Sequence, residues 1–266
     1  MTKVVIHNGS IMAAIVGPTG AEHRHLAHKV MSQALDEAKL SFSDITYVVA
    51  TGYGRINVPF ADKQVTEISC HARGVHSLFP RARTVIDIGG QDCKGIKLAD
   101  GKVVNFIMND KCAAGTGRFL EVIAEALEVR LEDIGEISLR SQHKVKISST
   151  CTVFAEQEVV SRLAEGVALE DILAAIHDSI AERIQTMVAR VKIEPEVVVT
   201  GGGALNVGLV HALETRLRTE VEIPPQPLLT GAIGAALVAR ELAERALEKG
   251  ALPRKERKLE GVKLFD

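Results

Sequence analysis

Two cysteines, each placed directly ahead of a helix-like segment, are the residues of this chain best suited to do chemistry. Cys112 lies in "NDKCAAGTGRFLEV" (residues 109–122), and Cys151 lies in "ISSTCTVFAEQEVV" (residues 147–160). The first N–H groups of a helix are unpaired and the helix dipole is positive there, so both stabilise a thiolate. We expect both sulfurs to face such N–H groups. Metal or cluster ligands, nucleophiles and buried packing thiols are the roles open to them.

Three apolar, strand-like segments end in glycine turns, at residues 51–54, 87–92 and 200–203. Glycine lets backbone N–H groups approach an anion without a Cβ in the way. A carboxylate beside such a turn can hold Mg²⁺ or orient a water molecule, and Asp87 and Asp92 are candidates for this. One such turn is most often only a turn, but three in one chain favour a nucleotide site. None of them matches the Walker A loop or the dinucleotide-binding fingerprint.

The elements that must position these residues alternate between apolar strands and amphipathic helices, which indicates an α/β fold. Asn8-Gly9 and Asp100-Gly101 predict the turns of two hairpins. A strand, a glycine turn and a hairpin recur in both halves, which suggests an internal duplication. We predict hairpins at 4–16 and 94–109, strands at 45–52, 84–88, 145–149 and 196–200, and helices at 21–40, 62–77, 115–127, 169–191 and 230–250.

The composition excludes several classes of protein. The 266 residues are 46% hydrophobic and 25% charged, with a formal net charge of −2, so nothing attracts the chain to nucleic acid or membranes. No apolar run reaches the ~18 residues of a membrane helix, and the N-terminus lacks a signal-peptide pattern. We therefore expect a cytoplasmic protein with no nucleic-acid or membrane partner. Structural disulfides are disfavoured there, so Cys70 and Cys93 are interpreted as packing thiols.

The order of the glycine turns resembles that of the actin–hexokinase–sugar kinase (ASKHA) superfamily, in which two duplicated domains close on ATP. In this resemblance "TVIDIGGQD" is similar to the second phosphate loop and "VVVTGGGALN" to the adenosine loop. The resemblance implies an α/β, ASKHA-like two-domain ATPase. Its first subdomain would be residues 1–81, with the helix at 231–248 packing back on it. Its second subdomain, residues 82–230, would carry both candidate cluster cysteines.

Six segments together resemble a narrower family, the ATP-dependent activators of 2-hydroxyacyl-CoA dehydratases and the ATPase subunits of benzoyl-CoA reductases. They are "ATGYGR", "ADKQVTEISCHARG", "VIDIGGQD", "MNDKCAAGTGRFLE", "ISSTCTVFAEQEV" and "VVVTGGGALN". The resemblance implies a dimer that shares one 4Fe–4S cluster between its chains. It also implies that hydrolysis of ATP with Mg²⁺ drives a low-potential electron from ferredoxin into catalytic reductase or dehydratase subunits.

The same resemblance assigns residues to these roles. The cluster cysteines of the family fall on Cys112 and Cys151. The phosphate loop supplies the candidate catalytic residues Asp87, Gln91 and Asp92. Backbone contacts to the nucleotide fall on Gly89 and Gly90 in that loop, and on Gly201, Gly202, Gly203 and Asn206 in the adenosine loop.

Within the family, "GYGRINVPFADKQVTEISCHARG" is most similar to the small ATPase subunit of benzoyl-CoA reductase. We therefore prefer an electron-activating ATPase subunit of benzoyl-CoA reductase, in anaerobic aromatic degradation. Its partner would be an identical chain or a related ATPase subunit. The alternatives are an activator of a 2-hydroxyacyl-CoA dehydratase, a small-molecule kinase of the same superfamily, and a non-catalytic nucleotide-binding protein.

The start of the chain departs from the family pattern. Family members open with a strand and a first phosphate loop, G-I-D-x-G-S/T-x-x-x-K, whereas this chain opens Met1-Thr2-Lys3, and Lys3 matches the end of that loop. We therefore expect the first subdomain to lack its opening strand here, and the native coding region to extend upstream. ATPase activity of the chain in this form is in doubt for the same reason.

Overall fold

The computed structural model describes residues 2–18, 23–147, 151–251 and 259. The chain divides into two compact units. The first comprises Met1–Pro80 and Leu228–Asp266, and the second comprises Arg81–Pro227. Among the described residues, no helix combines the length and the apolar character needed to cross a membrane.

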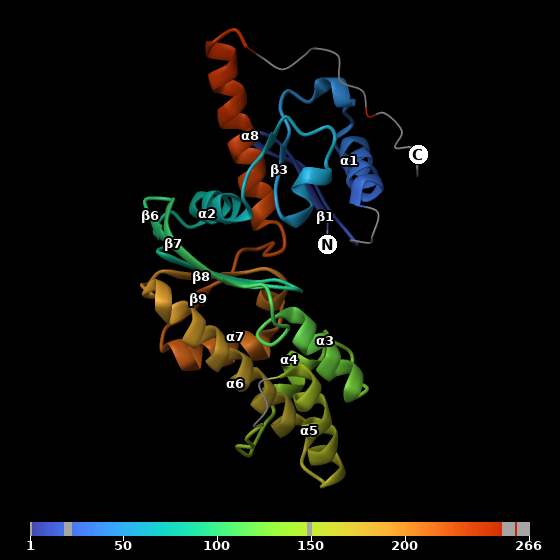
Figure 1. Ribbon diagram of the computed structural model, residues 1–266, viewed down its shortest axis with the longest axis vertical. Helices are drawn as coiled ribbons and strands as arrows, with labels where there is room; N and C mark the ends of the chain where they lie inside the picture. Colours follow the sequence, from blue (N-terminus) through green and yellow to red (C-terminus); the bar gives the residue numbers. More distant parts are fainter. Residues whose placement is uncertain (1, 19–22, 148–150, 252–258, 260–266) are drawn as a thin grey trace. The chain divides into compact units, whose positions relative to one another are not determined.

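A five-stranded sheet in the order β7-β6-β5-β8-β9 forms one layer of the second unit (Figure 1). The central strand β5 pairs antiparallel with β6 and parallel with β8. Every residue of β5 and β8 is buried, and apart from Thr84, Asp87 and Thr200 all of these residues are Val or Ile, as expected for strands covered on both faces. The strands are β5 (Thr84–Ile88), β6 (Cys93–Ala99), β7 (Lys102–Asn109), β8 (Val197–Thr200) and β9 (Val221–Glu222).

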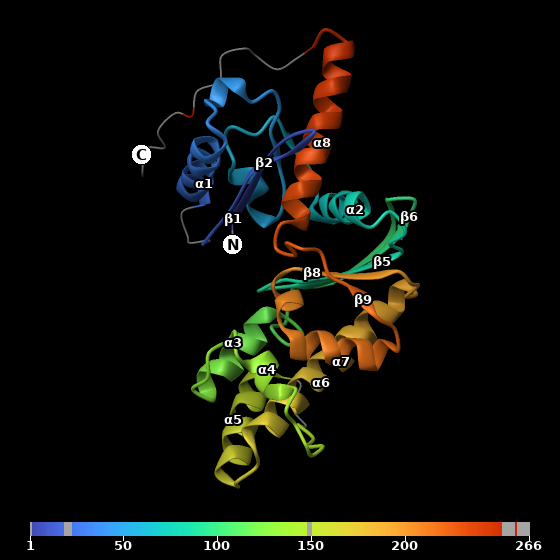
Figure 2. The same ribbon diagram turned by 180° about the vertical axis from the view of Figure 1, so that it is seen from behind.

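The helices of the second unit lie together on one side of this sheet in both views (Figures 1 and 2). The predicted long helix is confirmed as α6, whose apolar residues at every fourth position are all buried: Ile172, Ile176, Ile180, Ile184 and Val188. The helices are α3 (Gly117–Ala126), α4 (Ile134–Ser138), α5 (Thr152–Ala164), α6 (Leu169–Val188) and α7 (Val207–Leu217), with short 3₁₀ turns η3 (Ala189–Val191) and η4 (Gly202–Leu205).

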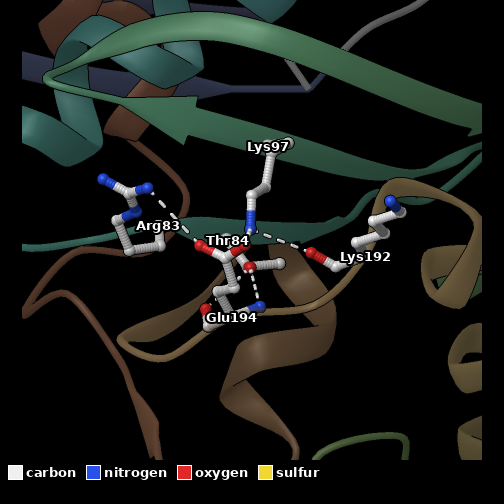
Figure 3. Close-up of polar contacts among 5 residues, drawn as sticks. All are labelled: Arg83, Thr84, Lys97, Lys192 and Glu194. Atoms are coloured by element: carbon white, nitrogen blue, oxygen red, sulfur yellow. Dashed lines mark hydrogen bonds and ion pairs between the residues drawn. The ribbon is translucent and has the colours of Figure 1, made fainter.

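Side chains of two paired residues, Thr84 on β5 and Lys97 on β6, fix the segment that precedes β8 (Figure 3). The Thr84 hydroxyl donates to Glu194 O at 2.8 Å and accepts from Glu194 N at 2.9 Å. The Lys97 ammonium donates to Lys192 O at 2.9 Å and contacts Glu194 Oε1 at 2.7 Å. The hydrogen bond from Lys97 lowers the pKa of Glu194. These contacts set the segment beside β5, where the parallel pairing starts at Thr84 and Val197.

The first unit opens with the predicted hairpin, in which Gly9 makes the turn with φ +79°. The helix α8 packs on α2 and on β1, and the α2–α8 contact is close because a Cβ on Gly234 would overlap Cys70 O. The elements are β1 (Thr2–Asn8), β2 (Ser10–Gly17), α1 (His23–Ala38), η1 (Phe42–Asp44), β3 (Val49–Ala50), η2 (Tyr53–Asn57), β4 (Lys63–Gln64), α2 (Glu67–Leu78) and α8 (Thr230–Glu248).

The sheets of the two units show the duplication that the sequence suggests. In the second unit β5 joins an antiparallel hairpin, β6–β7, to the parallel pair β8–β9. The first unit has an antiparallel hairpin, β1–β2, and a parallel pair, β3–β4, as two separate sheets. Within the described residues, no strand joins these two sheets in the way that β5 joins β6 to β8.

Two predicted strands differ from the structure. The strand expected at 45–52 is confined to Val49–Ala50. The strand expected at 145–149 is wrong for residues 145–147, which are irregular, while residues 148 and 149 lie outside the described residues. The residues directly before this segment are bonded to a helix: Asp171 Oδ1, at the start of α6, accepts hydrogen bonds from Ser141 Oγ, Gln142 N and His143 N. The backbone that leads into residues 145–147 is thus fixed to α6 and not to a neighbouring strand.

Candidate functional site

The glycine turn, defined here as residues 89–92, connects β5 to β6 and is closed by a hydrogen bond from Gly89 N to Asp92 O at 2.9 Å. A Cβ on Gly89 would lie 2.5 Å from Asp92 Oδ1, so a larger residue there would have to displace the Asp92 carboxylate. Nothing lies within 4 Å of the place that a Cβ on Gly90 would take, and Gln91 is exposed. The turn therefore has an open side at its tip.

Three buried charges lie beneath the glycine turn. The sheet register places Asp87 opposite Lys94 on one side and opposite Thr200 on the other. Lys94 Nζ donates to Asp87 Oδ2 at 3.2 Å and contacts Asp92 Oδ1 at 2.7 Å, while Thr200 Oγ1 donates to Asp87 Oδ1 at 2.9 Å. The Lys94 side chain is only 3% exposed. One ammonium therefore compensates two carboxylates out of contact with bulk water, where an unpaired charge is costly.

These contacts give different roles to Asp87 and Asp92, the two aspartates that the sequence analysis selected. Both carboxylate oxygens of Asp87 accept hydrogen bonds from β6 or β8, so Asp87 holds the strands and Lys94 in place. Asp92 belongs to the glycine turn itself. Sequence reasoning missed Lys94, although its signal was available, because Lys94 and Asp87 stand at equal distances from the centre of a tight hairpin turn.

The two cysteines interpreted as packing thiols are buried. Burial, followed by the charge of Asp87, raises the pKa of the Cys93 thiol. Burial likewise raises the pKa of Cys70. Both thiols are thus held in the protonated form inside the protein.

The second loop of the unit, Gly201–Gly203, lies against the end of β5. Gly201 has φ +82°, and a Cβ there would overlap the carbonyl group of Ile88. A Cβ on Gly203 would lie 2.5 Å from Ile88 Cγ2, while Gly202 is exposed. Because Ile88 immediately precedes the glycine turn, the structure brings together the two loops at the carboxyl ends of β5 and β8. Ligands of open α/β sheets bind at such strand ends.

A buried histidine, which the sequence did not reveal, supports the second loop. Asn206 Oδ1 accepts from Leu209 N at 2.9 Å and so caps α7, which turns Asn206 Nδ2 toward His177 Nε2 at 3.1 Å. The His177 proton is then on Nδ1, which donates to Ser138 Oγ at 2.9 Å, and Ser138 Oγ donates to Gly135 O at 2.7 Å. Burial lowers the pKa of His177 to about 4, so the ring is neutral at pH 7. Both the oxygen and the nitrogen of the Asn206 side chain are thus occupied by hydrogen bonds within the protein.

Cys112 lies in the loop between β7 and α3 and is half-buried. Asn109 Nδ2, at the end of β7, donates to Cys112 O at 2.9 Å and to Ala114 O at 3.0 Å. The expectation that the first N–H groups of α3 face the sulfur is wrong. Gly117 N donates to Gly89 O at 2.8 Å, and Arg118 N donates to Gly90 O at 2.9 Å.

Cys151 is the N-cap residue of α5 and is exposed, so its position at a helix start is as predicted. Its helix packs against α3, the helix that follows Cys112. Among the described residues, no group of three or more His, Cys, Asp or Glu side chains is arranged to hold a metal ion. Four large apolar side chains of α5 are exposed along the helix, two of them directly after Cys151: Val153, Phe154, Val160 and Leu163.

The third glycine turn, at residues 51–54, belongs to the first unit. Gly52 has φ +78° and precedes η2, and its carbonyl accepts from Arg55 Nη1 at 2.9 Å. Gly52 is thus required by the backbone conformation of this turn.

Comparison with known proteins places these features in a family. The chain is 48% identical over 244 residues to the 2-hydroxyisocaproyl-CoA dehydratase activator of Clostridioides difficile, covering 91% of this chain and 92% of the relative. It is 50% identical over 218 residues to the activator of lactoyl-CoA dehydratase of Anaerotignum propionicum, covering 82% and 84%. A benzoyl-CoA reductase subunit of Thauera aromatica is 36% identical over 219 residues, covering 80% and 77%.

Solved structures agree with the sequence relatives. The activator of the 2-hydroxyisocaproyl-CoA dehydratase from Clostridium difficile, solved with bound ADPNP, has a TM-score of 0.83 at 48% identity, covering 90% of each chain. The actin–hexokinase-like fold class is thereby confirmed. The profile of one family matches residues 2–239, a span that includes both glycine loops and both accessible cysteines. The chain belongs to the BadF/BadG/BcrA/BcrD ATPase family.

Proposed function

We propose that this chain is an ATP-hydrolysing activator that delivers low-potential electrons from ferredoxin to a 2-hydroxyacyl-CoA dehydratase. The observation that carries the proposal is the similarity of the chain to dehydratase activators, at 48% and 50% identity, against 36% for the benzoyl-CoA reductase relative. This difference reverses the preference that one sequence segment gave. The benzoyl-CoA reductase ATPase remains the second candidate, since that relative still covers most of the chain.

The residues of the second unit fit a nucleotide. The glycine turn offers an open side at Gly90, and the second loop exposes Gly202 beside it. We assign the phosphates to the turn and the adenosine to the second loop. Asp92 and Gln91 would act on Mg²⁺ and on the attacking water. Asp87 would act through Lys94 and the strands, because hydrogen bonds occupy both of its oxygens.

The donor set of the chain fits half of a 4Fe–4S cluster. Cys70 and Cys93 are buried, which leaves Cys112 and Cys151 as the accessible thiols. A 4Fe–4S cluster takes four thiolates, so two chains would each give these two. When bound, the cluster would supply one-electron transfer at low potential. A second copy, or a related ATPase chain, would also cover the exposed apolar side chains of α5, such as Phe154 and Val160.

Anaerobic purification tests the proposal. We expect iron and sulfide in a dimer, hydrolysis of ATP, and electron delivery from reduced ferredoxin to a dehydratase partner with its 2-hydroxyacyl-CoA substrate. Cys112→Ser and Cys151→Ser should each lose the iron, whereas Cys70→Ser is the matched control and should retain it. Delivery to a benzoyl-CoA reductase but not to a dehydratase would favour the second candidate. A full complement of iron in Cys112→Ser would reject the cluster assignment.

A further inference from the structure

The helix α3 begins in an unusual way. A helix N-terminus leaves its first N–H groups without intrahelical partners, and an N-cap threonine normally accepts from one of them. Thr116 is the N-cap residue of α3, but its hydroxyl makes no such bond to the helix. Instead Thr116 Oγ1 donates to Ala113 O at 2.7 Å, with Gly90 O at 3.3 Å as a second, longer acceptor. The carbonyls of the glycine turn therefore take over as the cap of α3.

The contact between α3 and the glycine turn is close. Gly117 N donates to Gly89 O at 2.8 Å, and Arg118 N donates to Gly90 O at 2.9 Å. A Cβ on Gly117 would lie 3.2 Å from Gly89 O and 3.3 Å from the Gly90 Cα. Thr116 is fully buried. Backbone thus packs directly on backbone, with no flexible side chain between them to absorb a movement.

The same peptide groups have a second, outward edge. The carbonyl of Gly89 shares one rigid, planar peptide with the N–H of Gly90, and the carbonyl of Gly90 shares the next with the N–H of Gln91. Within the described part of the chain, these two N–H groups donate to no other residue. Each plane therefore presents a hydrogen-bond donor on one edge while its other edge caps α3. A phosphate that accepted from the N–H groups would reorient and polarise the carbonyls on which α3 rests.

Cys112 directly precedes Ala113, the residue whose carbonyl accepts from the Thr116 hydroxyl. The loop from Cys112 to Thr116 is held by Asn109 at two carbonyls and by its own turn, in which Thr116 N donates to Ala113 O at 3.0 Å. The loop is therefore short, internally bonded and fixed both to the end of β7 and to the glycine turn. A displacement of Gly90 is passed to Cys112 through a few consecutive hydrogen bonds.

We propose that Thr116 is a positioning residue, which couples phosphate binding at the glycine turn to the exposure of the Cys112 thiol. The proposal rests on the proposed function for its nucleotide, and it goes beyond that function by naming the contact that carries the signal. Thr116 acts through its hydroxyl, which holds the Cys112 loop at Ala113 and the glycine turn at Gly90 together. Its methyl group fills the buried space that a valine would also fill.

The test measures thiol reactivity in the full chain prepared without iron. Iodoacetamide labelling of Cys112 and of Cys151 is followed by mass spectrometry, with and without Mg²⁺ and a non-hydrolysable ATP analogue. Calorimetry measures binding of the analogue independently. We expect the analogue to change the labelling rate of Cys112 by about fivefold or more, and that of Cys151 much less. Thr116→Val should bind the analogue but lose this change, and Thr116→Ser, which keeps the hydroxyl, should retain it.

The outcomes separate the two proposals. A wild-type chain that binds the analogue, but labels Cys112 at an unchanged rate, overturns the coupling and leaves the proposed function standing. A chain that does not bind the analogue overturns both. Thr116→Val with the full wild-type response overturns the role of Thr116. If Thr116→Val does not fold, the wild-type chain and Thr116→Ser still decide the matter, because a missing response in either contradicts the coupling.

Discussion

Asp87 and Lys94 are a cross-strand pair that links β5 to β6 directly below the glycine turn, with Lys94 Nζ 3.2 Å from Asp87 Oδ2. The same ammonium lies 2.7 Å from Asp92 Oδ1. A turn suited to an anion thus lies above a buried group of charges with an excess of one negative charge. Lys94 offsets the repulsion between the two buried carboxylates, because its ammonium contacts both of them.

Removing Lys94 should destabilise the second unit. In Lys94→Met two buried carboxylates lose their cation, and breaking a buried ion pair in this way costs about 3–5 kcal/mol. Urea unfolding at pH 7 measures the loss, which should shrink at low pH, where protonated carboxyls carry no charge. Lys102→Met is the control, because Lys102 is exposed on β7. A loss in Lys94→Met no greater than that of the control would contradict the assignment.

His177 should make the protein sensitive to acid. Its pKa is about 4 in the folded chain against 6.5 in the unfolded chain, so between these values only the unfolded chain binds the proton. The free energy of unfolding therefore falls as the pH drops from 6.5 toward 4, by about 3 kcal/mol in total. His177→Gln should lose less stability than wild type over this range.

The comparison for His177 requires an exposed histidine. His211→Gln, on the exposed side of α7, should retain the wild-type pH dependence of urea unfolding. Identical pH profiles for His177→Gln and wild type would show that His177 titrates alike in the folded and unfolded chains, and would reject the buried, neutral assignment.

Thr84 should stabilise the pairing of β5 with β8. Thr84→Val preserves the shape but leaves both the N–H and the carbonyl of Glu194 without this partner, which costs about 1–3 kcal/mol. Thermal and urea unfolding measure the effect. The matched control is Thr215→Val, whose exposed hydroxyl donates only within its own helix. Equal stability of the two variants would mean that Thr84 has no such role.

The glycines of the two loops should differ in their tolerance of a methyl group. Gly201→Ala places a Cβ against the Ile88 carbonyl at a positive φ and should cost more than about 2 kcal/mol. Gly90→Ala meets open space and should change stability by no more than about 1 kcal/mol. Under the proposed function, both should weaken nucleotide binding. A stable Gly201→Ala, judged by its unfolding midpoint, would contradict the close contact of the loop with β5.

Local patterns were sufficient for much of the fold. Asn8-Gly9 fixed a hairpin because few other residues adopt φ > 0, and the four-residue spacing of isoleucines fixed the buried face of α6. The irregular backbone at residues 141–143 could not be predicted, since its partner Asp171 is distant in sequence. Lys94 could be inferred from the turn, but His177 could not. Its role depends on three helices that meet at Ser138 and Asn206.

The preference for benzoyl-CoA reductase has a similar explanation. It rested on a segment that includes Cys70 and Gly74, and the structure shows what these residues do. Cys70 is fully buried, and a Cβ on Gly74 would overlap the carbonyl of Thr230, so both serve the packing of α2 on α8. At these two positions the segment reflects helix packing within the chain.

The fixed tautomer of His177 also makes it a built-in spectroscopic reporter. A ring proton held on Nδ1 by Ser138, away from solvent, should exchange slowly and give a separate imidazole resonance. Because Asn206 holds the opposite nitrogen, the ¹⁵N chemical shift of Nε2 should follow any rearrangement at the end of the second loop. Ligand titrations could then be followed by NMR at a single native side chain, with no label attached to the nucleotide.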